Sequence, residues 1–439
     1  MEKIVIKINE IDKILNIPTP NWLPKDWYKE NENPFDWFDE IDRPFLENTT
    51  GMARYTLNFP SNLVKLETNP TSNYFYFIHK TPSDFFDNKI FNKYINDDVL
   101  SDIKNNKCKI VFYMDDDGGW GEKVPYFYND DKLDILNQWV IKNNFTKEQV
   151  YFISHNCFLE PTDKKNKFTP ISCSNLQYTS NISNHHQRKN SLYINYHHCG
   201  FIAEDSFTYD FNKIEKIFLS YNKNIGPHRF YFMYSLLKNN LINDFLYSFV
   251  ENNTDAYCVD RINNYLIDKS KKILDVNIIE KTNNEVGKEI LSDKIQVHEF
   301  NGEYYGQYLQ IEDFEKTFMS VVTESNVGTN TIYFSEKTIR VLLTKHPFIL
   351  ISSQNSLKKL KEFGFKTFSK WWDESYDECE HFIDRIDKVT QVIKSIKKKT
   401  NKELIQIRQE MEEILLHNQR ILLKKDSLGW LEQIQNIKF

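Results

Sequence analysis

The chain has 439 residues, 40% of them hydrophobic and 27% charged, so it is long enough for two domains of ordinary globular composition. Its net charge of −6 argues against a protein that binds polyanions without selection. No window holds the roughly 18 continuous apolar residues of a transmembrane helix, and the charged, alternating start is unlike a signal peptide. The six cysteines form no CxxC pair and indicate reduced thiols, so we expect a cytoplasmic protein.

The first half of the sequence contains one clear βαβ unit. Residues 4–8 alternate between apolar and polar types and predict a strand, at the edge of a sheet. Residues 17–38 are rich in proline and tryptophan and are predicted to cover an outer surface. The apolar run 107–114 predicts a buried strand, helical spacing over 133–140 predicts a helix, and residues 149–154 predict a second strand. Parallel strands need such a helical crossover, so these elements predict a parallel sheet.

The second half alternates strands and helices in the same way, after a polar block at 157–200 that predicts loops and short strands. We predict strands at 215–222, 318–325 and 347–352, and helices that open at Pro227, span 336–345 and span 355–364 with Gly364 as C-cap. The fold class is therefore α/β, with domains at 1–208 and 209–384. Residues 385–439 predict a helical tail that packs on the body as two helices, or alternatively a short coiled coil or dimer arm.

Candidate binding residues follow the strand at 318–325. Open α/β sheets bind ligands at the carboxyl ends of their strands, so Glu324 and Ser325 are expected to face a crevice. Glu336 and Lys337 then begin the next helix, whose N-terminus attracts anions, and Lys337 adds the positive charge that a diphosphate needs. The alternative is that Ser335 caps this helix, Glu336 complements its dipole and Lys337 is solvated.

A second group of polar residues follows the strand at 215–222. Asn222 and Lys223 end that strand, and Arg229 lies at the start of the next helix. A cation at this position can reach the same crevice from the neighbouring strand, and the planar guanidinium of arginine suits phosphate. The alternative is an exposed basic loop.

The order of these motifs resembles the C-terminal domain of GT-B glycosyltransferases. It is most similar to the alpha-1,3-fucosyltransferase family and to related glycosyltransferase-like proteins of phages and large viruses. The matching segments are TESN (323–326), YFSEK (333–337), TIRVLLTKHPFIL (338–350) and GFKTFSKWWDESYDE (364–378). Ser335 stands where the family usually has threonine, and TESN departs from the family's E-N-S order. The similarity covers about residues 315–385 and, more weakly, 216–240.

The resemblance implies two Rossmann-type domains that face a cleft, and a metal-independent glycosyl transfer of the fucosyltransferase type. The donor would be a GDP- or UDP-linked sugar, no cofactor would be needed, and the acceptor would be a hydroxyl of a glycan, a protein or a modified base. Arg229 and Lys337 would hold the diphosphate. Glu336 would bind ribose or sugar hydroxyls, and Glu324 would contact the donor sugar. If the chain is viral, its compartment would be the host cytoplasm.

An inverting transfer also needs a carboxylate base in the facing domain. The loop DDDGGWGE at 115–122 follows the first buried strand, and within it Asp117 and Glu122 are the predicted catalytic residues. Aspartates at this place also fit a GT-A transferase, where they would hold Mg²⁺ or Mn²⁺, or a solvated acidic loop. The irregular residues 1–60 favour GT-B over GT-A, so no metal is predicted.

Two other functions remain open at this stage. The lysines at 394–402 leave room for a phage-type transferase that acts on DNA bases, although a solvated connection between helices explains them more simply. A non-catalytic GT-B-like interaction or virion protein is the second alternative. The histidines and cysteines between 155 and 199 lack the paired spacing of a zinc finger, and we interpret them as surface or acceptor-site residues.

Overall fold

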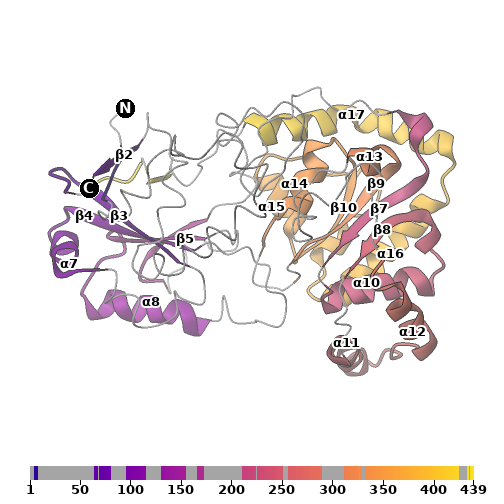
Figure 1. Ribbon diagram of the computed structural model, residues 1–439, viewed down its shortest axis with the longest axis horizontal. Helices are drawn as coiled ribbons and strands as arrows, with labels where there is room; N and C mark the ends of the chain where they lie inside the picture. Colours follow the sequence, from indigo (N-terminus) through magenta and orange to yellow (C-terminus); the bar gives the residue numbers. More distant parts are fainter. Residues whose placement is uncertain are drawn as a thin grey trace, which may run out of the picture.

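The computed structural model describes two separate parallel sheets and the helices that cover them (Figure 1). The described residues are 4–7, 64–67, 69–80, 95–114, 130–154, 166–172, 210–223, 225–250, 256–288, 311–325, 327, 332–424, 433–434 and 436–439. The Pro- and Trp-rich stretch, the loop with Asp117 and Glu122, and the histidines and cysteines between 155 and 199 lie outside these residues.

The first sheet has six parallel strands in the order β2-β1-β3-β4-β5-β6. These strands are β1 (Ile4–Lys7), β2 (Val64–Glu67), β3 (Tyr74–Lys80), β4 (Cys108–Met114), β5 (Val150–Ser154) and β6 (Thr169–Ser172), with helices α7 (Asp97–Lys104) and α8 (Asp130–Lys142). The predicted βαβ unit is confirmed as β4, α8 and β5. The predicted edge position of the first strand is wrong, because β2 pairs with β1 on one side and β3 pairs with it on the other.

The second sheet has four parallel strands in the order β10-β9-β7-β8. Its strands are β7 (Lys216–Asn222), β8 (Phe245–Phe249), β9 (Thr317–Thr323) and β10 (Phe348–Ile351). Its helices are α10 (Pro227–Lys238), α11 (Ala256–Asp268), α12 (Val276–Glu285), α13 (Ile311–Glu315), α14 (Glu336–Leu343) and α15 (Ser356–Glu362). The three predicted strands are confirmed, and so are the three predicted helices, including Pro227 in the first turn of α10 and a positive φ of 89° at Gly364. The strand β8 was not predicted.

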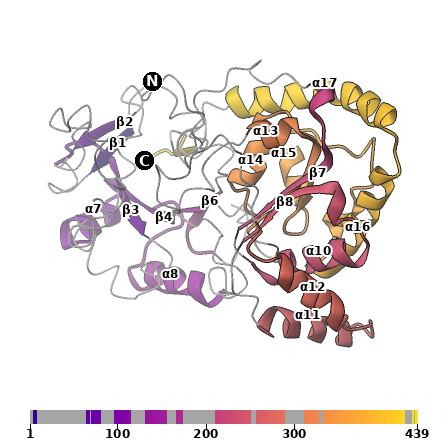
Figure 2. The same ribbon diagram turned by 45° about the vertical axis from the view of Figure 1, so that its right-hand side comes forward.

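The direction in which the chain crosses the second sheet reverses between β7 and β9. From β7 the chain crosses through α10 to β8 on one side, and it later returns to β9 on the other side of β7. Successive crossovers in opposite directions place their helices on opposite faces of the sheet. Figures 1 and 2 accordingly show α10 on one face and α14 on the other. Such a reversal opens a crevice at the carboxyl ends of the two central strands.

Two long helices, α16 (Phe382–Lys397) and α17 (Asn401–Lys424), form the predicted tail and pack on the body. On α16, Asp387 accepts a hydrogen bond from Tyr231 of α10 at 2.8 Å. On α17, Arg408 donates to the carbonyl of Lys345 at 3.0 Å. Packing on the body is confirmed, and α16 begins at Phe382, so the predicted boundary between 384 and 385 falls inside its first turn.

The end of the chain lies against the first sheet. The ring of Phe439 lies 5.0 Å from that of Phe75 on β3, and Nζ of Lys109 on β4 is 5.3 Å from the Phe439 ring centre. Figure 1 shows the C-terminus beside these strands, so the last described residues of the chain lie against the first sheet although they follow the helices of the second sheet in the sequence.

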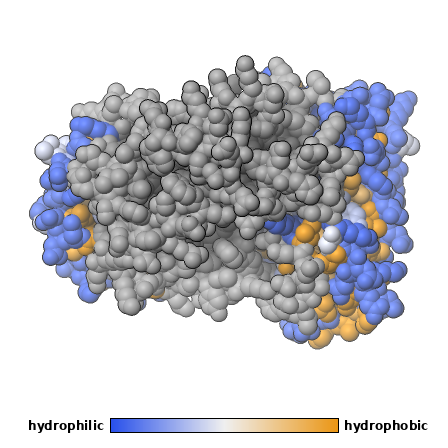
Figure 3. Space-filling view, in the orientation of Figure 1, coloured by the Kyte–Doolittle hydropathy of each residue, from blue (hydrophilic) through white to orange (hydrophobic). Residues whose placement is uncertain are grey.

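The described surface is largely hydrophilic at both ends of the molecule (Figure 3). A small apolar area lies near α11 and α12, where Ile267, Ile273 and Val276 are exposed. Among the described helices, none combines the length and the apolar character that crossing a membrane would take.

The imidazole of His346 gives the second sheet a pH-dependent contact. The ring is fully buried; Nε2 donates to the carbonyl of Thr317 at 3.0 Å, and Nδ1 lies 2.8 Å from the hydroxyl of Ser320. Burial lowers the pKa of His346 to about 3, with the positive charge of Arg408 adding to the effect. The neutral ring therefore stabilises the fold above the ordinary histidine pKa, and this contribution decreases as the pH falls below it.

We expect the free energy of unfolding to decrease between pH 7 and pH 5, with His346 contributing about 2 kcal/mol of that decrease. Urea denaturation at the two pH values measures it, and the pH-dependent difference should be smaller in His346→Gln. An equal difference in the variant and the parent protein would show that His346 does not carry the effect.

Candidate active site

The candidate site lies where the chain reverses direction on the second sheet. We call it the switch-point edge: the carboxyl ends of β7 and β9 together with the first turns of α10 and α14. Open α/β sheets bind ligands at this place because no crossover covers the crevice there. Of the residues predicted from the sequence, those after the two strands meet at this edge.

The first turn of α10 bonds to the end of β9. Nε2 of His228 lies 3.0 Å from the carbonyl oxygen of Glu324, and Nη2 of Arg229 donates to the carbonyl of Thr323 at 3.2 Å. A Cβ at Gly226 would lie 3.2 Å from the ring of His228, so a larger residue there would require the ring to shift. Both basic side chains are buried. Arg229 thus lies at the end of β9 and ties α10 to this strand, and its binding of a diphosphate stays a prediction.

Asn222 holds the strand ends together. Its side chain donates to the hydroxyl of Ser220 at 3.1 Å and accepts a hydrogen bond from Thr323 at 2.6 Å, while its backbone N–H donates to Ser248 at 3.1 Å. Because these contacts join β7, β8 and β9, we assign Asn222 a positioning part in the edge. Lys223, the next residue, is exposed.

The carboxylate of Glu324 faces the start of α14. It is fully buried, and its Oε1 accepts hydrogen bonds from the backbone N–H of Ser335, at 3.0 Å, and from the hydroxyl of Thr338. The hydroxyl of Ser335 in turn accepts from the N–H of Lys337 at 3.2 Å, so Ser335 caps the helix. Internal acceptors therefore already satisfy part of the N-terminus of α14.

The remaining predicted residues lie beside this junction. Lys337 is partly exposed, and its Nζ donates to the Ser335 hydroxyl at 3.3 Å. Ser325 is partly exposed and directly follows Glu324. The side chain of Glu336 lies outside the described part of the chain.

Positive charge from three helices surrounds His228. Burial lowers the pKa of His228 well below its ordinary value, and the charges of Arg229, Arg385 and Lys337 lower it further. His228 is therefore neutral near pH 7, while the other three side chains carry the charge. These residues come from α10, α14 and α16, so cations from three helices act on the same end of α10, beside the carboxylate of Glu324.

Arg385 of α16 adds to this positive charge from a fully buried position. Its guanidinium donates to the carbonyl of Cys379, and among the described residues no carboxylate lies within ion-pair distance of it. Burial lowers its pKa to about 10, an effect that the Asp377 carboxylate opposes. A buried cation of this kind is costly unless an anion approaches it.

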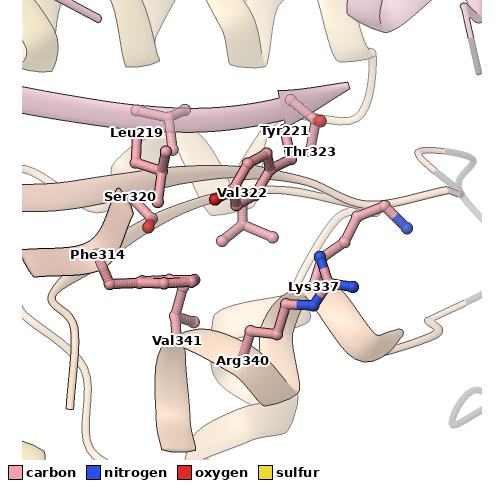
Figure 4. Close-up of a pocket in the computed structure, with 10 residues that line it drawn as sticks. Leu219, Tyr221, Phe314, Ser320, Val322, Thr323, Lys337, Arg340 and Val341 are labelled. Carbon is pink, nitrogen blue, oxygen red and sulfur yellow. The ribbon is translucent and has the colours of Figure 1, made fainter. Parts of the chain in front are cut away.

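A small cavity of about 20 Å³ lies between α14 and the sheet (Figure 4). Its lining residues come from β7, α13, β9 and α14: Leu219, Tyr221, Phe314, Ser320, Val321, Val322, Thr323, Lys337, Arg340 and Val341. Lys337 was predicted as a binding residue and Arg340 was not. Residues three apart on a helix share a face, and this spacing could have identified Arg340 as a companion of Lys337.

The charged residues that the sequence analysis missed are Arg340 and Arg385. Arg385 was assigned to the tail, whose apolar spacing gave no sign that an arginine would be buried beside His228. The described residues contain no group of three His, Cys, Asp or Glu side chains placed to hold a metal ion.

Comparisons with known proteins give similarities in structure alone. No family model matches the sequence, and no curated protein matches it. A solved glycosyltransferase from Rickettsia africae ESF-5 aligns with 84% of this chain and all of its own, at 8% identity and a TM-score of 0.34. An α,α-trehalose 6-phosphate synthase from Burkholderia multivorans aligns over 99% of both chains, at 10% identity and a TM-score of 0.36.

The Glu324 junction can be tested by removing the carboxylate. In Glu324→Ala the N–H of Ser335 and the hydroxyl of Thr338 lose their buried acceptor, so we expect a loss of about 1–3 kcal/mol in the free energy of unfolding. Urea denaturation measures the loss. The control is Glu362→Ala, which removes a surface partner of Lys359 and should change stability by less than about 0.5 kcal/mol. Equal effects of the two substitutions would contradict the assigned part of Glu324.

Proposed function

We propose that this protein is a glycosyltransferase that binds a nucleotide sugar at the switch-point edge and transfers the sugar to an acceptor on the side of the first sheet. The observation that carries the proposal is that the positive charges of Arg229, Lys337 and Arg385 all act on His228, whose Nε2 contacts the Glu324 carbonyl just after β9. A diphosphate needs fixed cations at a ligand-binding edge of this kind. The sequence motifs that resemble GT-B transferases fall at the same edge.

In this proposal the cations stabilise the leaving group. As the glycosidic bond breaks, negative charge builds up on the departing diphosphate, and donors that are already in place stabilise that charge without reorganising. Lys337 is partly exposed and can contact a phosphate directly. Arg229 is buried and donates a hydrogen bond to the Thr323 carbonyl. In the proposal it therefore does two things: its charge attracts the diphosphate, and its hydrogen bond holds α10 against the end of β9. The transfer needs no metal in this scheme, and the donor is a GDP- or UDP-linked sugar of the fucosyl type.

The carboxylates that were predicted as site residues have different roles in this proposal. Glu324 fixes the start of α14, and we now propose that it positions Lys337 and does not itself bind the sugar. Glu336 remains the proposed contact to ribose or sugar hydroxyls, and Ser325 and Lys223 remain proposed donor-binding residues at the same edge. Asp117 or Glu122, in the loop after β4, is the proposed base that takes the proton from the acceptor hydroxyl. The acceptor is a glycan, a protein or a modified base.

The lysines that suggested a DNA-base transferase are partly engaged within the protein. Nζ of Lys397 forms an ion pair with Asp244 at 2.6 Å and donates to the carbonyl of Asn240 at 3.2 Å. These contacts attach the end of α16 to the body, which favours the simpler explanation of the cluster as a connection between helices.

Nucleotide sugars should stabilise the protein against heat. At about 100 times its dissociation constant, a donor that binds only the folded state adds about 2.7 kcal/mol, which a thermal-shift panel of GDP, UDP, ADP and dTDP sugars detects. Lys337→Met should raise the dissociation constant by about 10- to 100-fold because it removes a charge-assisted contact. Lys402→Met, at an exposed position on α17, is the control and should leave the shift unchanged.

Two results would count against this donor site. The first is that none of the nucleotide sugars shifts the melting temperature at millimolar concentration. The second is that Lys337→Met keeps the full shift of the parent protein.

Substitutions in the loop after β4 should slow the transfer reaction without weakening the binding of the donor. Asp117→Asn and Glu122→Gln should each keep the donor-induced thermal shift, and the one that removes the base should lower the transfer rate by about 10²- to 10⁴-fold. Transfer is measured as nucleotide release with the acceptor that supports turnover. If both variants transfer at the parent rate, the base lies elsewhere.

A further inference from the structure

The guanidinium of Arg340 is largely buried, and the described residues offer no partner to two of its three nitrogens. The residue is 6% exposed, and in the part of the chain that the structure describes neither Nε nor Nη2 has a hydrogen-bond acceptor. Leaving a buried charged donor unsatisfied is costly, and folded proteins seldom do so. An unpaired guanidinium beside a cavity therefore points to an anion that is bound there during function.

Among the described residues, no carboxylate forms an ion pair with Arg340. The cavity wall is mostly apolar, with Leu219, Val322 and Phe314 facing Arg340 across it. Asp313 is buried close by, but its Oδ2 already accepts a hydrogen bond from Tyr221 at 2.6 Å. The positive charge of Arg340 opposes the rise in the pKa of Tyr221 that burial and Asp313 cause, which places the guanidinium near this pair without an ion pair to it.

Lys337 faces the same cavity from one turn earlier on α14. Figure 4 shows both side chains on the side of the cavity nearest the carboxyl ends of the strands, with the end of Lys337 extending further outward than the guanidinium of Arg340. Lys337 also acts electrostatically on His228, whereas α10, which carries His228 and Arg229, covers the opposite face of the sheet. Lys337 thus lies between Arg340, on one face of the sheet, and the basic residues His228 and Arg229, on the other face.

We propose that Arg340 and Lys337 together bind a phosphate group, with Arg340 as its main guanidinium partner. A cavity of about 20 Å³ accommodates about one water-sized group, so one phosphate oxygen enters it and the rest of the ligand stays at the edge. The planar fork of arginine donates to phosphate oxygens in pairs, and Lys337 adds a point charge. The inference rests on the proposed function, because Lys337 belongs to both and the phosphate would be that of the nucleotide donor.

Titration calorimetry with inorganic pyrophosphate, and separately with GDP and UDP, tests the inference on the full chain. Arg340→Met should raise the dissociation constant for pyrophosphate at least about tenfold, and Arg340→Lys should raise it less because it keeps the charge. Arg420→Met, at an exposed position on α17, is the matched control and should bind like the parent protein. Without ligand, Arg340→Met should melt no lower than the parent protein, because an apolar side chain of similar length replaces an unpaired buried charge.

The outcomes separate the inference from the proposed function. If nucleotide sugars bind the parent protein and Arg340→Met equally well, the function stands and the inference fails. If pyrophosphate binds in an Arg340-dependent way but no nucleotide binds, the phosphate site stands and the donor proposal fails. If neither pyrophosphate nor a nucleotide binds the parent protein, both fail. Should Arg340→Met not fold by circular dichroism, unchanged pyrophosphate binding in Arg340→Lys and Arg340→Gln would overturn the inference, and weakened binding in both would support it.

Discussion

The residue Glu324 joins three elements, and the placement of every proposed phosphate contact depends on it. Its carboxylate accepts from Ser335 and Thr338 at the start of α14, while its backbone carbonyl lies within hydrogen-bonding distance of His228 on α10. A buried carboxylate is costly without donors, and these donors come from a segment that follows β9 by eleven or more residues. The first turns of two helices on opposite faces of the sheet are therefore fixed to one residue at the end of a central strand.

Much of the second sheet could be predicted from local patterns, because its central elements carry strong local signals. Pro227 marks the first turn of α10, Ser335 caps α14, and β9 and β10 are short apolar runs bounded by polar residues. The strand β8 (FLYSF) is brief and follows α10 after a short connection, and the pattern there gave no separate signal. The edge position of β1 was predicted wrongly because strand order is a long-range property. Its partner β2 lies about sixty residues away, and no local pattern shows which strands pair.

The site shows the same division between local and long-range information. The rule that ligands bind at the carboxyl ends of parallel strands led to the region of Arg229, Glu324 and Lys337, and the structure brings these residues to one edge. The rule does not say which polar groups the fold itself uses. Glu324 is engaged by α14, and Arg340 has no partner among the described residues, although both are charged residues of ordinary appearance in the sequence. Burial of Arg340 depends on Tyr221 and Phe314, which lie on other elements, so a helix pattern alone places it in solvent.

Buried cations without a carboxylate partner among the described residues lie on both faces of the second sheet, and their position explains why an anion would bind at the edge between them. Arg340 lies on the α14 face and Arg385 on α16, and in the described part of the chain neither has a carboxylate partner. Each lowers the stability of the empty protein, and an anion at the edge between them would offset the cost of both. On the proposed function, ligand binding would then stabilise the fold as well as fill a pocket, because the ligand would supply the negative charge that the described residues do not place beside these two cations. A diphosphate carries more negative charge than a single small anion and can accept hydrogen bonds at both of its phosphates, which suits an edge where several cations lie.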